Sequence, residues 1–182
     1  MKQYGFIIMR AQPFHYGHQH IINEILLDGR IPMILLGDDG GLNKIKNPLS
    51  YEQRRTLIQL VYPNTPIIFH KLQDKDNWSK WFDEVGHKAT MFNSISIENI
   101  QFYYNHKPED KYDAFECYGK EYTNDYYTQI FVDNDVKVKQ VSFASKDDIK
   151  VHATATNIRN DIDNLKHLLD ARVYWKLKEW GW

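Results

Sequence analysis

Cysteine is almost missing from this sequence, which contains Cys117 alone among 182 residues. An internal disulfide needs two cysteines, so a disulfide-stapled scaffold of the secreted type is excluded. Long apolar runs are missing as well, because no stretch reaches the roughly 18 apolar residues of a membrane span and no charged-then-apolar leader is present. We therefore expect a cytoplasmic protein without a membrane partner.

An excess of charge of either sign is also lacking. Lysine and arginine total 23 residues, aspartate and glutamate total 24, and the formal net charge is −1. This balance gives no general attraction to polyanions, so we expect no nucleic-acid partner and only local basic sites. The 182 residues, 42% of them hydrophobic, suffice for a buried core and predict one domain, residues 1–182.

The most informative stretch lies near the start of the chain. A short apolar strand, Tyr4–Met9, runs into residues 10–18, which read Arg-Ala-Gln-Pro-Phe-His-Tyr-Gly-His, and then into an amphipathic helix. In an α/β sheet, such a turn aims the free N–H groups and the positive dipole end of the helix above the carboxyl end of the strand. The spacing matches neither G-x-G-x-x-G nor G-x-x-x-x-G-K-[ST], which excludes these two nucleotide-binding motifs.

Several groups in this run suit a phosphate ligand. His15 and His18 lie near the helix start, where they can donate hydrogen bonds to phosphate oxygens, and Gly17 permits a close approach of backbone and ligand. Arg10 adds a permanent guanidinium with the fork geometry that fits phosphate. The alternative is a surface loop with incidental histidines, which leaves this convergence unexplained. We predict a polyphosphate site here.

A second arginine occupies a helix start where the helix dipole disfavours a cation. Ser50 and Gln53 form a capping-box pattern that starts a helix ending near Tyr62, and Arg54 lies in the first turn on its apolar face. Either a phosphate ligand compensates this inward-facing arginine, or its side chain reaches solvent or pairs with Glu52.

A third arginine, Arg159, follows a run of threonines. Thr154 or Thr156 is expected to cap a helix with Arg159 in its first turn. Threonine hydroxyls, backbone N–H groups and a guanidinium together suit phosphate. The alternative is a capped helix without a ligand.

A tryptophan follows the strand predicted at 67–70. Trp78 comes directly after a polar loop with Asp74 and Asn77, and it begins a helical stripe that continues in Trp81. Trp78 either packs in the core or offers a platform for a flat cationic ring, where cation–π attraction reaches ~2 kcal/mol after desolvation.

Strands alternate with helices along the chain, which predicts a doubly wound α/β fold with a mostly parallel sheet. Its ligands bind above the carboxyl ends of the strands, where the candidate residues fall. The tryptophan-rich C-terminus is expected to pack either on the domain itself or on a partner subunit in a homo-oligomer. Besides the segments above, we expect helices at 17–28, 125–131 and 163–180, and strands at 31–36, 91–97, 101–104, 114–118 and 137–143.

In order along the chain, these motifs resemble those of nicotinamide-mononucleotide adenylyltransferases of the His-x-Gly-His superfamily. The resemblance is nearest to the archaeal type and to the adenylyltransferase half of bifunctional adenylyltransferase/Nudix enzymes, and no Nudix motif is present. It rests on residues 12–18 with Arg10, 47–50 with Arg54, 77–78 with Asp74, and 153–159.

The resemblance implies a Rossmann-like fold and an enzyme that joins ATP and nicotinamide mononucleotide into NAD and pyrophosphate. It implies Mg²⁺ as cofactor, carried on the ATP phosphates rather than by a metal site of the protein. The implied catalytic residues are His15, His18 and Arg159, the implied ATP and phosphate contacts are Arg10, Phe14, Gly17, Arg54, Thr154 and Thr156, and the implied nicotinamide contacts are Trp78, Asp74 and Asn77.

Two alternatives stay open. The same reaction can use another phosphate acceptor, nicotinate mononucleotide or phosphopantetheine, or the chain can be a regulator that binds NAD or ATP without turnover. The sequence also departs from the family pattern, because residues 97–113 resemble an insertion and a family motif of the form Gly-x-x-Lys-Asp matches 119–127 loosely. Lys120 in that stretch is either a phosphate ligand or a solvated surface lysine.

Overall fold

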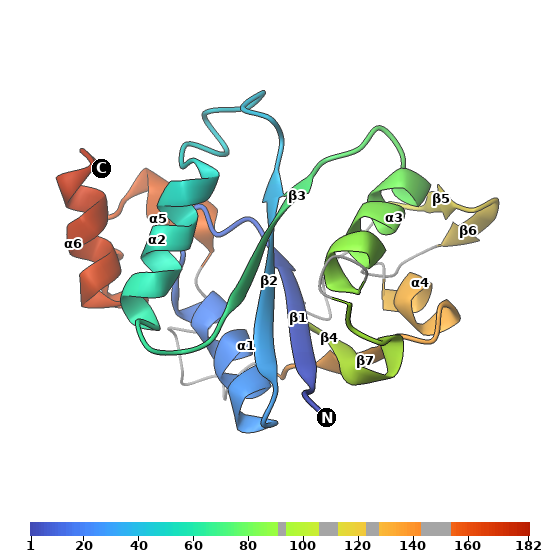
Figure 1. The fold of residues 1–182 in the computed structure, drawn as a ribbon. Coiled ribbons are helices and arrows are strands. Elements are labelled where there is room, and N and C mark those ends of the chain that lie inside the picture. The colour runs from blue at the N-terminus through green and yellow to red at the C-terminus, as the bar shows by residue number, and fades with distance from the viewer. Residues whose placement is uncertain (91–93, 106–112, 123–127, 143–153) are drawn as a thin grey trace.

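The computed structural model describes residues 1–90, 94–105, 113–122, 128–142 and 154–182. Its centre is a parallel sheet of five strands in the order β3-β2-β1-β4-β7 (Figure 1). This confirms the predicted doubly wound α/β fold. The strands are β1 (Tyr4–Met9), β2 (Ile31–Asp38), β3 (Ile68–Gln73), β4 (Ile100–Tyr104) and β7 (Lys137–Gln140).

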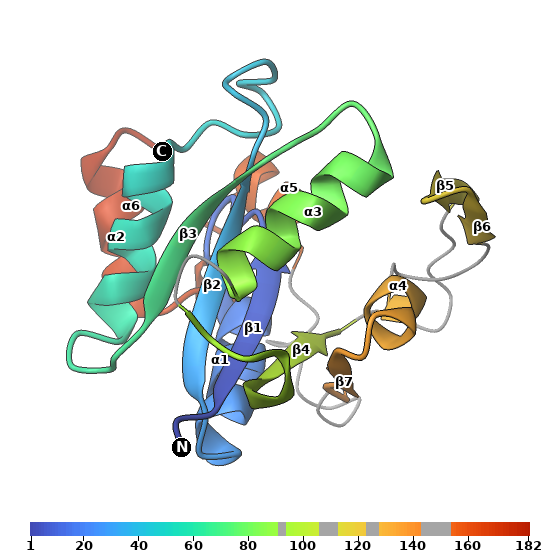
Figure 2. The same ribbon diagram turned by 45° about the vertical axis from the view of Figure 1, so that its right-hand side comes forward.

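Helices cover both faces of the sheet (Figure 2). One face carries α1 (Tyr16–Leu27), α2 (Tyr51–Val61), α5 (Ala155–Asn160) and α6 (Ala171–Glu179). The other face carries α3 (Trp78–Ala89), α4 (Thr128–Asp133) and a small hairpin of β5 (Phe115–Cys117) and β6 (Lys120–Tyr122). Among the helices of the described residues, none is long and apolar enough to cross a membrane.

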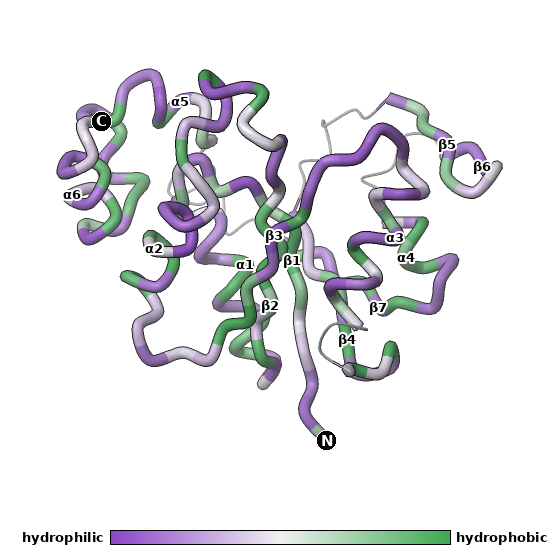
Figure 3. The backbone as a smooth tube through the Cα atoms, turned by 45° about the horizontal axis from the view of Figure 1, so that its top comes forward, coloured by the Kyte–Doolittle hydropathy of each residue, from purple (hydrophilic) through white to green (hydrophobic). Residues whose placement is uncertain are grey.

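The strands divide their side chains between two apolar cores. In β1, Ile7 and Met9 face the core under α1 and α2, whereas Phe6 faces the core under α3 and α4. Successive strand residues point to opposite faces, so a strand covered on both sides is apolar at every position. Figure 3 shows the result as hydrophobic strands at the centre, with a hydrophilic connection between β3 and α3.

A glycine in β1 sets how closely α1 approaches the sheet. A Cβ atom at Gly5 would lie 2.5 Å from Cγ2 of Ile25 and 2.9 Å from Cε2 of Tyr103. Both side chains are fully buried, so they have little room to move away. Close packing of α1 therefore requires glycine at this position.

The helix starts predicted from a capping side chain are confirmed for α2 and α5. Ser50 and Gln53 form the expected capping box of α2, and Thr154 rather than Thr156 caps α5 by accepting the N–H of Asn157 at 3.3 Å. Asn77 caps α3 in the same way. These side chains satisfy N–H groups that the first turn of a helix leaves without partners.

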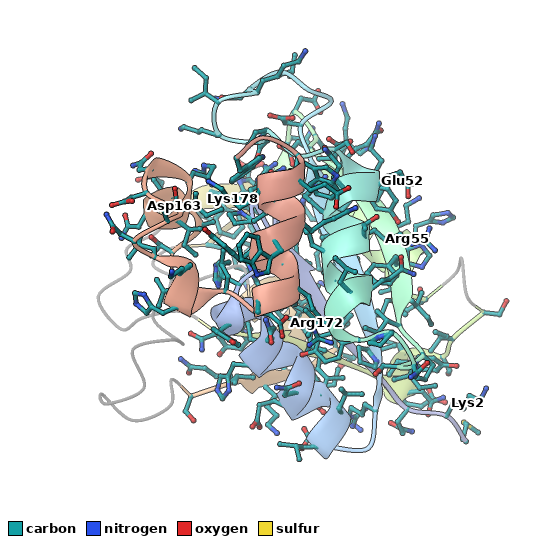
Figure 4. The ribbon with its side chains drawn as sticks, turned by 90° about the vertical axis from the view of Figure 1, so that its left-hand side faces the viewer. Lys2, Glu52, Arg55, Asp163, Arg172 and Lys178 are labelled. Atoms are coloured by element: carbon teal, nitrogen blue, oxygen red, sulfur yellow. The ribbon has the colours of Figure 1, made fainter. Side chains whose placement is uncertain are left out.

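The single closing helix expected over 163–180 is wrong. A short 3₁₀ helix, η4 (Lys166–Leu168), comes first, Leu169 is extended, and Asp170 then caps α6. Figure 4 shows α6 beside α2, with Lys178 and Asp163 on its outer side; these two side chains form an ion pair of 3.1 Å. Asp170 breaks the helix because its carboxylate caps a new N-terminus.

Three further expectations need correction. The strand predicted at 91–97 is wrong where it can be judged, because 97–99 form the 3₁₀ helix η2 (Ile97–Asn99), while 91–93 lie outside the described residues. An insertion over 97–113 is wrong for its first part, since β4 lies in the sheet between β1 and β7; residues 106–112 lie outside. The strand at 114–118 exists as β5 but belongs to the separate hairpin.

Candidate active site

The carboxyl end of β1 is where the strand order reverses, with β2 on one side of β1 and β4 on the other. Ligands of doubly wound folds bind in the crevice at such a point. Two adjoining pockets open here. The histidine pocket, about 520 Å³, is lined among others by His18, Lys46, Thr156 and Arg159. The tryptophan pocket, about 500 Å³, is lined among others by Asn77, Trp78 and Trp81, and both pockets share Arg10 and Asp74.

His15, the last residue of the loop after β1, and His18, in the first turn of α1, build the start of this helix. His15 is the N-cap residue, and its Nδ1 accepts the N–H of Gly17 at 3.1 Å. Nδ1 of His18 accepts the N–H of His15 at 3.3 Å, and the two rings lie with centroids 3.9 Å apart. Because Nδ1 is an acceptor in both rings, a neutral ring carries its hydrogen on Nε2. That Nε2–H group is the donor which each histidine can offer to a ligand.

Burial keeps both rings neutral. It lowers the pKa of His18 to about 4. Burial also lowers the pKa of His15 well below its ordinary value, with a smaller effect from His18. His18 lines the histidine pocket, whereas His15 is only 6% exposed and lies behind it. His18 is thus the histidine that a ligand in this pocket can contact directly.

Phe14 and Gly17 support this arrangement from outside the pocket lining. Phe14 is fully buried, and its ring stacks on His18 with centroids 5.8 Å apart and planes 11° apart. The N–H of Gly17 is already donated to His15. A direct ATP contact by either residue stays a prediction, and their observed contacts orient the histidine rings.

Arg10 and Asp74 form the boundary between the two pockets. Nη2 of Arg10 donates to Oδ2 of Asp74 at 2.6 Å, and both side chains are close to half exposed. An exposed pair of this kind contributes little to stability, typically under ~1 kcal/mol. It can therefore open at low cost when an anionic ligand competes for the guanidinium.

Arg54 is inward-facing as predicted, but its partners are different from those expected. Its side chain is 1% exposed, and Nη1 donates to the carbonyl oxygens of Arg10 at 2.9 Å and Gly37 at 2.6 Å. It lines neither pocket, and its pairing with Glu52 is wrong because Glu52 lies near Arg55 instead. The buried guanidinium thus joins the ends of β1 and β2, which compensates its charge without a phosphate.

Arg159 reaches the histidine pocket from α5. Nη1 donates to the carbonyl oxygen of Gln12 at 2.5 Å, and Nη2 donates to Oγ1 of Thr156 at 3.0 Å. The expected place in the first helical turn is wrong, because Thr154 is the cap and Arg159 lies in the last turn of this short helix. The helix dipole favours a cation there. Thr156 and Arg159 both line the pocket, while Thr154 acts as the cap.

Trp78 lies at the start of α3 and is half-buried. It lines the tryptophan pocket, and on its other sides it contacts Trp81 and Phe115 with ring centroids 5.3 and 4.3 Å away. Oδ1 of Asn77 accepts the N–H of Lys80, so the Asn77 amide is held at the rim of this pocket. Trp78 therefore has both of the roles considered from the sequence: part of its surface packs on the core, and another part faces the pocket.

The loop after β2 contributes residues that were not predicted. Asp39 accepts N–H groups of Gly41 and Asn43 and the amide of Asn47, and this folds the loop so that Lys46 lines the histidine pocket. The sequence signal that could have located this loop is the Gly-Asp-Asp-Gly-Gly run at the carboxyl end of a strand.

Lys120, the lysine that the sequence offered as a phosphate ligand, pairs with Asp133 and lines neither pocket. These contacts fit a structural lysine.

Whether the protein can bind a divalent cation directly depends on the acidic side chains near the histidine pocket. In the described part of the chain, no group of three or more His, Cys, Asp or Glu side chains can hold a metal ion. Asp39 is used by its own loop and Asp74 by Arg10. Magnesium binds readily through phosphate oxygens and water. The residues present thus fit an ion that arrives on a polyphosphate, and not a cage of protein ligands.

A family model described as cytidylyltransferase-like matches residues 10–162. The chain belongs to the cytidylyltransferase-like family. The matched residues include the whole crevice, from Arg10 at the end of β1 to Arg159 in α5. This confirms the nucleotidylyltransferase resemblance that the histidine motif predicts.

Relatives of known name agree with this family. A nicotinamide-nucleotide adenylyltransferase of Halorubrum lacusprofundi is 26% identical over 97 residues, which are 52% of this chain and 55% of that protein. The fold is similar to a bifunctional NMN adenylyltransferase/ADP ribose pyrophosphatase of Francisella tularensis, with a TM-score of 0.65 and 21% identity over 94% of this chain and 44% of the other. The chain thus spans about half the length of these two proteins.

A third similar protein has nearly the same length as this cytidylyltransferase-like chain. It is the nicotinic acid mononucleotide adenylyltransferase of Plasmodium falciparum in complex with NaAD, with a TM-score of 0.63 and 10% identity. The match covers 100% of this chain and 97% of that protein. At this identity the likeness establishes the shared Rossmann-like fold.

Proposed function

We propose that this protein transfers the adenylyl group of ATP to the phosphate of nicotinamide mononucleotide and so produces NAD and pyrophosphate. The observation that carries the proposal is the pair of pockets that meet at Arg10 and Asp74. One offers Trp78 as a platform for a ring, and the other offers His18 and Arg159 for phosphates. A reaction that joins a ring-bearing phosphate to a nucleotide needs two such sites side by side.

The reaction needs no nucleophile from the protein. A phosphate oxygen of the mononucleotide attacks the α-phosphorus of ATP in line, and the bond from that phosphorus to the bridging oxygen of the β-phosphate breaks as pyrophosphate leaves. Transfer of this kind depends on positioning and on neutralising charge. His18 would donate through Nε2–H, while Arg159 and Thr156 would bind the phosphates that leave. Lys46 adds a further cation on the same side.

Arg10 has a separate role in this scheme. Because it lines both pockets, its guanidinium can contact the acceptor phosphate and the ATP phosphates at the point where they meet. Mg²⁺ would supply further charge neutralisation on the ATP phosphates. Arg54 would act indirectly, since it fixes the carbonyl of Arg10 and hence the strand end from which Arg10 extends.

The preference for nicotinamide mononucleotide over phosphopantetheine rests on the tryptophan pocket. Trp78 and Trp81 suit a flat pyridinium ring, which phosphopantetheine lacks. The same pocket is lined by acidic and basic side chains in equal number, Asp74, Asp76, Arg10 and Lys75. The charges of the lining therefore do not separate the nicotinamide from the nicotinate ring, and we propose nicotinamide mononucleotide as the acceptor to be compared directly with nicotinate mononucleotide.

The direct test measures pyrophosphate release from ATP and Mg²⁺ with each of three acceptors, nicotinamide mononucleotide, nicotinate mononucleotide and phosphopantetheine. Mass spectrometry of the dinucleotide product identifies the acceptor used. Release that is fastest with nicotinamide mononucleotide supports the proposal. Release with phosphopantetheine alone, or with none of the three, contradicts it.

A regulator that binds NAD or ATP without turnover is the competing function, and His18 separates the two. We expect His18→Ala to lower kcat by about 10²- to 10³-fold, because one donor to developing charge is lost, with a much smaller change in ATP affinity. His20→Ala on the same helix is the matched control, since His20 contacts the carbonyl of Ser142 and lines neither pocket. Equal losses of turnover and affinity in His18→Ala would argue against a catalytic role.

A further inference from the structure

Behind Trp78 lies a residue that the reaction itself does not require. The ring of Phe115, in β5, lies with its centroid 4.3 Å from that of Trp78 and with the two planes only 31° apart. At this distance the two rings are in contact, in an arrangement that is tilted but closer to parallel than to edge-on. Trp78 lines the tryptophan pocket and Phe115 does not. Phe115 therefore covers a side of the indole that is turned away from the pocket.

Phe115 is itself held by a further ring. It pairs across the hairpin with Tyr122, and their rings are stacked with centroids 5.4 Å apart and planes 13° apart. Tyr122 is 7% exposed, and its hydroxyl donates to Asp133 in α4 at 3.0 Å. A stack of three aromatic rings thus runs from the pocket wall at Trp78 to a fixed point on α4.

The hairpin is also fastened to α3, the helix that begins at Trp78. The N–H of Tyr118, at the hairpin turn, donates to Oγ of Ser79 at 2.9 Å, and the Tyr118 hydroxyl donates to Asp83 one turn further along. Figure 2 shows the hairpin beyond the N-terminal end of α3 and apart from the main sheet. These contacts fix the distance between β5 and the first turn of α3.

Trp78 is thereby held on two sides. Phe115 covers one side of the indole, and Trp81 meets it edge-on with planes 77° apart. A platform whose orientation is fixed before the ligand arrives loses less freedom on binding. We propose that Phe115 is a positioning residue for the acceptor ring, so that the β5–β6 hairpin sets the affinity of the pocket for a pyridine mononucleotide without touching it. This inference rests on the proposed function.

The test compares steady-state constants for nicotinamide mononucleotide and for ATP in the wild type, Phe115→Ala, Phe115→Tyr, Trp78→Ala and the double variant. We expect Phe115→Ala to raise KM for the mononucleotide about three- to tenfold, the factor that corresponds to one lost aromatic pair. KM for ATP and kcat should not change, because Phe115 lines neither pocket. Phe115→Tyr should restore the wild-type KM, since it keeps the ring.

The double variant separates positioning from general damage. If Phe115 acts through Trp78, then Phe115→Ala adds no further rise in KM when Trp78 is already alanine. Glu116→Ala, an exposed neighbour on the same strand, is the control for the hairpin and should behave as the wild type. The proposal is overturned if KM stays unchanged in Phe115→Ala, if it rises equally for both substrates, or if the rise persists without Trp78.

If the proposed function itself is wrong, the experiment gives a different result. In that case the wild type releases no pyrophosphate with any pyridine mononucleotide, whatever residue 115 is. The fluorescence of tryptophan, which a stacked pyridinium ring quenches, then measures binding of nicotinamide mononucleotide without catalysis. Quenching that weakens in Phe115→Ala supports the positioning role, and a wild type that shows no quenching overturns it.

Discussion

The start of α1 requires neutral histidines, and this makes the stability of the fold depend on pH. Nδ1 of His18 accepts the N–H of His15, and a proton on that nitrogen would replace the acceptor with a second donor. Burial lowers the pKa of His18 from its ordinary value of 6.5 to about 4. The folded protein therefore resists a proton that the unfolded chain accepts.

The sign and size of the effect follow from these two values. Above pH 6.5 His18 is neutral in both states, and its contribution to stability is fully present. As the pH falls from 6.5 to 4, the unfolded chain binds a proton and the folded chain does not, so the free energy of unfolding decreases. At pH 5 the decrease from His18 alone is about 2 kcal/mol relative to pH 8. His15 changes in the same direction.

The assay is urea unfolding at pH 8 and pH 5, followed by tryptophan fluorescence, in the wild type, His18→Asn and His167→Asn. The amide oxygen of asparagine lies near the place of Nδ1 and keeps the cap without a titrating ring. We expect the difference in stability between the two pH values to shrink by about 2 kcal/mol in His18→Asn. His167 is exposed on η4, away from both pockets, so His167→Asn should match the wild type.

A pH-dependent loss of stability that is equal in wild type and His18→Asn would refute this reasoning. So would a protein that becomes more stable toward pH 5, because a histidine that gains a partner on protonation would have the opposite sign. Either result would mean that the ring nitrogen of His18 is not an obligatory acceptor in the folded state.

Two further predictions concern the loops around the crevice. Gln12→Leu removes both the donor and the acceptor that pair with the main chain of Leu49 at 2.9 Å each, and we expect a loss of about 2 kcal/mol in the free energy of unfolding, measured in urea. Arg54→Met leaves two strand-end carbonyls without their charged donor and should cost about 3 kcal/mol, while the half-exposed neighbour Arg55→Met should cost far less; equal losses would count against the role of Arg54.

The parts of the fold that were predicted correctly depend on local sequence. Tyr4–Met9 is apolar at every position except its first, and both neighbours in the chain are polar, so the strand could be located to the residue. Ser50 and Gln53 predict the first residue of α2, because a capping box is a contact between residues three apart in the sequence. Patterns of this range are complete within a few residues of sequence.

The errors have two different causes. The leucines and tryptophans after 163 suit one long helix, but the side chain of Asp170 accepts the N–H of Arg172 and starts a new one; this cap is a local signal that the apolar pattern masked. At 97–104 the departure from the family pattern suggested an insertion, whereas these residues enter the sheet beside β1. Sheet order is set by non-local pairing, which periodicity along the chain does not contain.

The arginines show the same limit at the site itself. In sequence, Arg54 and Arg159 look equivalent, since each follows a cap residue of a helix. Both donate to carbonyl oxygens in the loop after β1, Arg54 to residue 10 and Arg159 to Gln12, so both hold the loop that leads into α1 and His18. They differ in exposure, because Arg54 is 1% exposed, whereas Arg159 lines the histidine pocket. A guanidinium has five N–H donors, and Arg159 can therefore hold the loop with one nitrogen and still present others to a phosphate, a combination that burial denies to Arg54.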